Sequence, residues 1–149
     1  MSLKEKIKDD IKQAMRDKNE SRVTTLRMLS AAIQRREVDE RIQLDDAQVI
    51  AVIEKLVKQG RESIEQYVKG GRTELADKES GEIAIYQAYL PQQLGDAEID
   101  KYIAEAIAAT GASSIKDMGK VMGVLKPKLQ GRADMGQVGG KIKAKLGAA

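Results

Sequence analysis

The sequence contains no cysteine and no histidine among its 149 residues. The missing cysteines exclude disulfide bonds, thiolate zinc sites and cysteine nucleophiles. The missing histidines remove the commonest general base and the commonest nitrogen ligand for metals, so that only carboxylate, lysine or tyrosine chemistry is left. We therefore expect a protein that is not catalytic on its own and that holds no cofactor and no metal.

Aromatic residues are scarce, at 3% of the chain, and neither Phe nor Trp occurs. Because hydrophobic residues still make up 42%, the core must be built from Ile, Leu, Val, Met and Ala. A chain of this length buries roughly 70% of its unfolded surface, which is enough for one packed domain or two small ones.

Long uncharged segments are missing as well. The longest, residues 83–95, has 13 residues, which is well short of the ~20 that span a bilayer. Residues 1–10 alternate charged and apolar side chains and do not resemble a secretory signal. The sequence therefore predicts a soluble cytoplasmic protein with no membrane association, and it leaves the oligomeric state open.

Apolar residues recur every three or four positions along most of the chain, which is typical of amphipathic helices. No segment alternates with period two, and no internal repeat is predicted. We expect an all-α fold with an N-terminal bundle of about four helices (1–91) and a C-terminal domain of three helices (92–149), joined at "YLPQQLGD". The predicted helices span about 2–17, 21–40, 45–69, 72–90, 96–110, 114–129 and 134–146.

Several residues have the type and position of helix caps. Ser2 and Glu5 have the spacing of a capping box, Asp45 or Asp46 can cap the third helix, and Asp96 can cap the fifth. Gly60, inside the third helix, indicates either a close helix contact or tolerated looseness. The methionines with helical spacing are predicted to fill the core: Met15, Met28, Met118, Met122 and Met135.

The stretch "MGKVMGVLKPKLQGRADMGQVGGK" is rich in glycine and lysine, as are loops that bind phosphates. Gly131 and Gly136 have the glycine spacing of a Walker loop, but Gln137 stands where that loop needs Lys, and no strand precedes it. We interpret the stretch as two helices. The glycines within them are expected to let neighbouring helix backbones approach closely: Gly119, Gly123, Gly139 and Gly140.

The charges are distributed unevenly. Residues 1–110 carry 18 Lys and Arg against 21 Asp and Glu, whereas residues 111–149 carry 8 against 2, which makes the C-terminal segment basic. Its acids are Asp117 and Asp134, and we expect its cations to form one positive surface that attracts phosphates. The candidate nucleic-acid-binding residues are Lys116, Lys120, Lys126, Lys128, Arg132, Lys141, Lys143 and Lys145.

An ordinary lysine-rich surface explains these cations equally well. The segment also has no aromatic residue on which a base could stack, since nearby Tyr102 is expected to face the core. Any contact with RNA should therefore recognise shape and phosphate rather than base sequence.

Four segments in order, "LRMLSAAIQRREVD", "RESIEQYVKGGRTELADKE", "YLPQQL" and "MGKVMGVLKPKLQGRAD", resemble the YqeY family over essentially the whole chain. The part from about residue 92 is similar to the tail domain of GatB, a subunit of the glutamine-dependent aminoacyl-tRNA amidotransferase. The resemblance implies an all-helical protein with a three-helix tail that contributes to holding tRNA. It also carries a label of carbon-nitrogen ligase activity with glutamine as amido donor, although the catalytic body of the amidotransferase is absent.

Two other groups of polar residues have structural explanations. Ser113 and Ser114 in "GASSIKD" superficially resemble an amidase serine loop, but such a relay needs a buried lysine, and Lys116 is expected on the outer face. We interpret both serines as helix caps. The paired carboxylates at 9–10, 37–40 and 45–46 could bind magnesium, but they lack EF-hand spacing and fit solvated helix ends.

Three hypotheses follow from the sequence. The first is a non-catalytic accessory protein that binds tRNA or other structured RNA through its basic C-terminal domain. The second is a protein-interaction module whose charged helices and "YLPQQL" junction dock a partner in tRNA aminoacylation or amidation. The third is a weak carbon-nitrogen ligase, for which no catalytic residue can be named.

Overall fold

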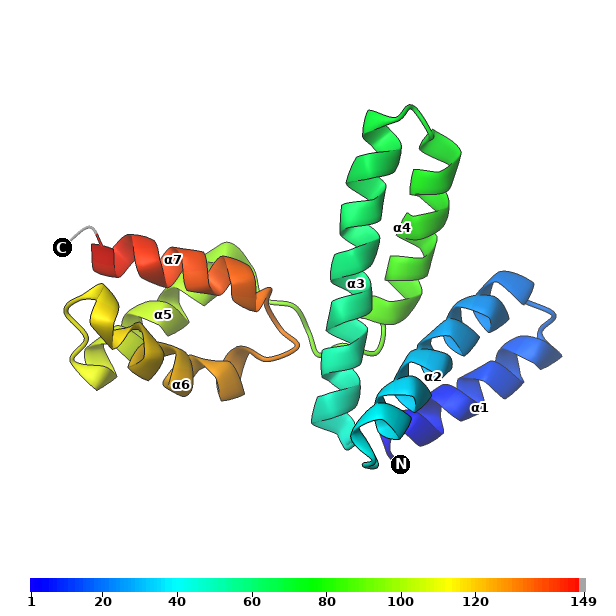
Figure 1. Cartoon of the computed structure of the whole chain (residues 1–149), viewed down its shortest axis with the longest axis horizontal. Coiled ribbons are helices and arrows are strands. Elements are labelled where there is room, and N and C mark those ends of the chain that lie inside the picture. Colours follow the sequence, from blue (N-terminus) through cyan, green and yellow to red (C-terminus); the bar gives the residue numbers. More distant parts are fainter. Residues whose placement is uncertain (148–149) are drawn as a thin grey trace. The chain divides into compact units, whose positions relative to one another are not determined.

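A computed structural model describes residues 1–147, which form seven α-helices and one short 3-10 helix and contain no strand (Figure 1). The all-α prediction is therefore confirmed. The chain divides into two compact units, Met1–Leu90 and Pro91–Ala149. The division into two domains at 1–91 and 92–149 stays a prediction. The helices are α1 (Leu3–Arg16), α2 (Glu20–Glu40), α3 (Asp46–Lys69), α4 (Thr73–Gln87), α5 (Asp96–Thr110), η1 (Ile115–Asp117), α6 (Met118–Leu129) and α7 (Met135–Gly147).

Side-chain caps fix the beginnings of several helices. Ser2 and Glu5 form the predicted capping box of α1, and Asp45 forms a second one with Gln48 at the start of α3. The predicted cap of α5 is wrong by one residue, because the N-cap position is occupied by residue 95 and Asp96 is already helical. In that position the charge of Asp96 still favours the start of the helix.

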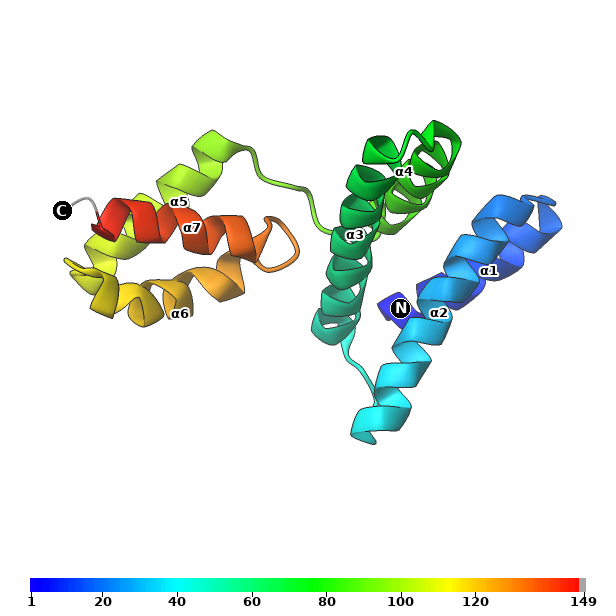
Figure 2. The ribbon, with the colours of Figure 1, turned by 45° about the horizontal axis from the view of Figure 1, so that its top comes forward.

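The N-terminal unit consists of two helix hairpins, α1 with α2 and α3 with α4, which both views show side by side (Figures 1 and 2). Its core is aliphatic, and Leu26, Leu29 and Ile53 are completely buried. Two methionines predicted for the core, Met15 and Met28, are instead 45% exposed. Each is adjacent in sequence to a buried residue and so points about 100° away from the buried face.

Helix α3 packs closely on α4 at Gly60, which is buried. A Cβ atom at this position would lie 2.9 Å from Cγ1 of Ile83 and 3.0 Å from its Cδ1. Both distances are shorter than normal carbon contacts, so a larger residue would force the Ile83 side chain or the helices to shift. Gly60 therefore marks a close helix contact, which is one of the two roles that the sequence predicted for it.

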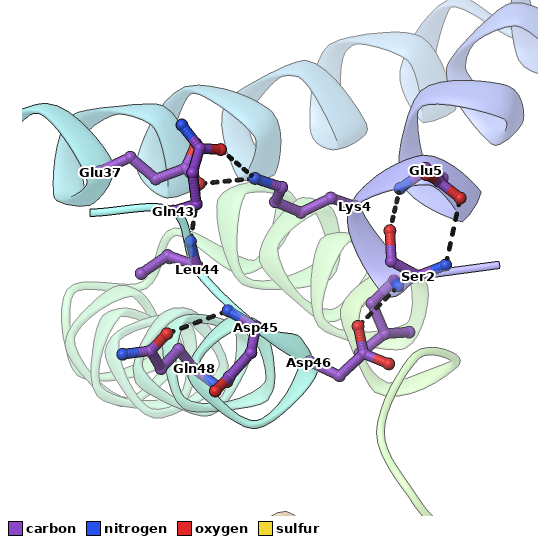
Figure 3. Close-up of polar contacts among 10 residues, drawn as sticks. Ser2, Lys4, Glu5, Glu37, Gln43, Leu44, Asp45, Asp46 and Gln48 are labelled. Carbon is purple, nitrogen blue, oxygen red and sulfur yellow. Dashed lines mark hydrogen bonds and ion pairs between the residues drawn. The ribbon is translucent and has the colours of Figure 1, made fainter.

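Glu37 connects three segments of the N-terminal unit near the C-terminal end of α2 (Figure 3). Its Oε2 accepts a hydrogen bond from Lys4 Nζ of α1 at 2.6 Å and another from the backbone N–H of Leu44 at 2.8 Å. In addition, the N–H of Leu3 donates to Asp46 at 2.9 Å. The start of α1 is thus fastened to the end of α2 and to the connection that leads into α3.

The C-terminal unit has a core of its own. Ile103, Val121, Leu125, Leu129 and Ile142 are completely buried and make up its centre. The remaining predicted core methionines, at 118, 122 and 135, are partly buried against it, as is the tyrosine at 102. No helix within residues 1–147, in either unit, is long and apolar enough to cross a bilayer.

Gly60→Ala should destabilise the protein, because the new methyl group overlaps Ile83. We expect a loss of about 1–3 kcal/mol in the free energy of unfolding, as for other overpacked cores. Gly81→Ala on α4 is the matched control, because nothing lies within 4 Å of its Cβ position. It should raise stability by up to about 1 kcal/mol. Urea denaturation followed by circular dichroism measures both changes, and equal effects would contradict the packing argument.

Glu37→Gln should lower the melting temperature at pH 7, and it should lower the melting temperature by less in acid. The hydrogen bonds from Lys4 and from the Leu44 N–H hold the pKa of Glu37 below its usual value of 4.5. A carboxylate with a lowered pKa stabilises the fold above pH 4.5, and this stability disappears as the pH falls through the folded-state pKa. The difference in melting temperature between wild type and variant should therefore shrink on acidification. The exposed Glu62→Gln serves as control, and a difference that stays constant with pH would refute this linkage.

Candidate nucleic-acid interface

The chain between α5 and α6 is shaped by two local features. Gly111 ends α5 in the left-handed conformation at φ 66°, which glycine adopts without strain. The carboxylate of Asp117 then accepts the N–H groups of Ser113 at 3.0 Å and Ser114 at 3.4 Å. These bonds, led by the one from Ser113, lower the pKa of Asp117. Both serines thus lie at the capped beginning of η1, and Lys116 beside them is exposed, as expected.

Helices α6 and α7 carry the same sequence pattern, although no internal repeat was predicted. Residues 118–129, MGKVMGVLKPKL, and residues 135–146, MGQVGGKIKAKL, are identical at seven of twelve positions, which hold M, G, V, G, K, K and L. An eighth position pairs Leu125 with Ile142. The prediction that the chain has no internal repeat is therefore wrong, and the signal was available as the repeated motif M-G-x-V-x-G.

The repeat extends to the environment of each residue. All twelve pairs of equivalent positions are buried to a similar degree, from the half-buried Met118 and Met135 to the buried Leu129 and Leu146. Each helix therefore turns the equivalent face toward the core of the unit.

The two helices run antiparallel. The Cβ position of Gly139 lies 3.5 Å from Cε of Met118, and that of Gly147 lies 3.4 Å from Cδ1 of Ile115. Both views show the same antiparallel course (Figures 1 and 2). Two antiparallel helices with equivalent contact faces are related by an approximate twofold axis normal to their common plane. Equivalent positions therefore appear on the same side of the hairpin.

One side of this hairpin carries exposed lysines and glycines that helical periodicity places together. The opposite side faces α5, since Lys141 reaches two aspartates of that helix. We call the side away from α5 the lysine–glycine face, and it consists of Gly119, Gly123, Lys126, Gly136, Gly140 and Lys143.

The glycines differ from their predicted role. Nothing lies within 4 Å of the Cβ positions of Gly119, Gly123 and Gly140, whereas that of Gly139 meets a methionine of the neighbouring helix. The expectation of close packing is wrong for the first three because they lie on the solvent side. Each glycine inside a helix costs about 1 kcal/mol relative to alanine. No packing within the described residues offsets that cost.

Pro127 lies inside α6, which continues for two more residues. Proline has no N–H, so the carbonyl of Gly123, four residues earlier, lacks the donor that an α-helix normally supplies. In α7 the equivalent of Pro127 is Ala144, whose N–H is available to the carbonyl of Gly140. The two halves of the hairpin therefore differ in backbone hydrogen bonding.

Helical periodicity divides four of the eight candidate cations between two sides of the hairpin. Lys126 and Lys128 are separated by about 160° around α6, because two residues correspond to about 200° of helical turn. The same holds for Lys143 and Lys145 on α7. Lys126 and Lys143 thus lie on the lysine–glycine face, whereas Lys128 and Lys145 lie on the side toward α5.

Lys141 is the clearest departure from the expected surface. Its Nζ lies 3.2 Å from Asp100 and 3.4 Å from Asp96, both on α5. The hydrogen bond to Asp100 is the main cause of a raised pKa of Lys141. The expectation of one positive surface took account only of acids after residue 110, and so it overlooked this double ion pair. Lys141 is consequently neutralised within its own unit.

The other seven cations differ in their partners. Lys120 lies 4.0 Å from Asp117 and is 71% exposed, so that this pair is weak.

Residues 91–149 carry nine Lys and Arg against six Asp and Glu, whereas residues 1–90 are balanced at 17 each. The excess positive charge of the chain thus lies in the C-terminal unit. Six cations have no ion-pair partner among residues 1–147: Lys116, Lys126, Lys128, Arg132, Lys143 and Lys145.

The fold and this basic hairpin define an all-helical protein of two units. A family model described as "Yqey-like protein" matches residues 4–146. The chain belongs to the YqeY family.

Three relatives share the name "Altered inheritance of mitochondria protein 41, mitochondrial". The one from Vanderwaltozyma polyspora is 31% identical over 75% of this chain and 64% of its own length. The relative from Eremothecium gossypii is 35% identical over 80% of this chain and 62% of its own length. The relative from Pyrenophora tritici-repentis is 29% identical over 96% of this chain and 80% of its own length. The chain thus spans less than two thirds of the first two relatives.

The expectation of a cytoplasmic protein is contradicted by this comparison, because all three relatives are named as mitochondrial proteins. The prediction rested on the lack of a secretory signal and of a bilayer-spanning segment. Neither absence identifies a compartment.

Lys141→Glu should destabilise the C-terminal unit, because it places a third carboxylate beside Asp96 and Asp100. Lys143→Glu has the same charge change at an exposed position without an acidic partner in the described residues, and it should leave stability nearly unchanged. Thermal unfolding followed by circular dichroism at low salt gives the comparison. Equal melting temperatures for the two variants would show that the double ion pair does not contribute to folding.

Proposed function

We propose that the C-terminal unit binds structured RNA through the cations of α6 and α7. The observation that carries this proposal is that the two helices contain no Asp or Glu and six Lys, three on each helix, of which Lys141 is held by acids of α5. A polyanion gains most from such a surface, because each neutralised phosphate releases counterions. The resemblance of this segment to the GatB tail makes tRNA the first RNA to test.

The proposal concerns binding and not catalysis. The chain has no histidine and no cysteine, and the region of α6 and α7 contributes lysines, one arginine and backbone groups. Such groups hold phosphates well but do not by themselves supply a general base with a pKa near neutrality. The label of carbon-nitrogen ligase therefore has no counterpart among these side chains, and the three fungal relatives carry names that state no activity.

Binding to tRNA should be micromolar at low salt and should weaken steeply with added salt. The slope of log K against log salt reports the number of phosphates contacted, at about −0.9 per phosphate for a duplex. Reversing the charge of four exposed lysines of the C-terminal unit should reduce both the affinity and the slope: Lys116, Lys126, Lys128 and Lys143. The matched control reverses four exposed lysines of the N-terminal unit: Lys8, Lys12, Lys55 and Lys58.

Fluorescence anisotropy with labelled tRNA measures these quantities for the full chain. The absence of binding by the wild type at low salt, or equal losses in the two sets of variants, would refute the proposal. A protein partner that stays bound after ribonuclease treatment, together with no affinity for tRNA, would favour the interaction-module hypothesis instead. Lys141 is left out of the variant set because we expect its substitution to destabilise the C-terminal unit.

A further inference from the structure

We propose that the lysine–glycine face receives the minor groove of a double-stranded RNA stem, with Lys126 and Lys143 each contacting one strand. This inference rests on the proposed function and specifies which RNA and which side of the hairpin are involved. Three features of the hairpin support it: its unpaired lysines, its approximate twofold symmetry and its exposed helix backbone.

The charges of the hairpin favour a polyanion over a second copy of the chain. Helices α6 and α7 have no acidic residue, and the acids of the unit lie on α5 or at the helix caps Asp117 and Asp134. Lys126 and Lys143 are exposed and have no acidic partner among residues 1–147. Two lysine–glycine faces brought together would oppose these like charges, whereas phosphates would complement them.

The symmetry of the hairpin matches that of a duplex. Lys126 and Lys143 hold equivalent positions in the second half of each helix. Because the helices are antiparallel, the two lysines lie toward opposite ends of the hairpin. The two strands of a duplex are also antiparallel and related by twofold axes, so equivalent lysines can contact equivalent phosphates on opposite strands.

The exposed backbone suits RNA in particular. The minor groove of an A-form helix is wide and shallow and displays 2′-hydroxyl groups. A surface without side chains at Gly123 and Gly140 lets this groove approach the helices closely. The minor groove of B-form DNA is only about 6 Å wide, so the face should prefer RNA.

The experiment first compares two pairs of lysines that are equivalent in the repeat. Lys126→Glu with Lys143→Glu reverses charge on the lysine–glycine face, and Lys128→Glu with Lys145→Glu reverses the same charge on the side toward α5. The probe is a fluorescein-labelled RNA hairpin of mixed sequence, and the readout is anisotropy with the full chain. The first pair should weaken binding at least about tenfold more than the second. Equal weakening would overturn the assignment of the face while leaving RNA binding intact.

A second arm adds methyl groups without changing charge. Gly123→Ala with Gly140→Ala should raise the melting temperature, because both Cβ positions are open. The same double variant should bind the RNA hairpin several-fold more weakly, since the methyl groups hold the groove away. Gly81→Ala on α4 should raise the melting temperature without affecting binding. Unchanged affinity in the double alanine variant would overturn the inference.

The choice of nucleic acid separates the two proposals. The stem should bind more tightly than a single strand of the same sequence and more tightly than a DNA hairpin of that sequence. Equal binding of all three would refute the minor-groove assignment and leave a non-specific phosphate site. No binding of any of them would refute the proposed function itself.

Discussion

The C-terminal unit depends on one aliphatic stripe that occurs twice. Val121, Leu125 and Leu129 on α6 have equivalents on α7, and this stripe fixes which side of each helix is buried. Because hydrophobic burial places no demand on the residues that face solvent, the remaining positions were free to become glycine and lysine. The exposed glycines and lysines of α6 and α7 therefore do not disturb the packing of the core.

Helix α5 completes this core and also limits the charge of the unit. Its aspartates neutralise Lys141 on one side of α7, while Lys143 on the opposite side has no acidic partner in the described residues. Net charge alone would have described the unit as uniformly basic. The distribution of acids in space makes one side of the hairpin more attractive to anions than the other.

Most of the fold could be predicted from the sequence, because helical periodicity and capping residues act locally. Ser2 with Glu5 and Gly111 are examples in which a few neighbouring residues suffice. The errors arise where a distant segment decides the outcome. The partners of Lys141 come from α5, and the solvent exposure of Gly123 depends on how α6 packs. The repeat was readable from the sequence but was hidden by its short length.

The repeat is imperfect at Pro127 and Ala144, and this difference gives the hairpin a direction. The last turns of the two helices are alike in charge and burial but unlike in hydrogen bonding, because the proline removes a donor from one of them. A ligand that spans both halves would therefore meet unlike backbone groups on α6 and α7.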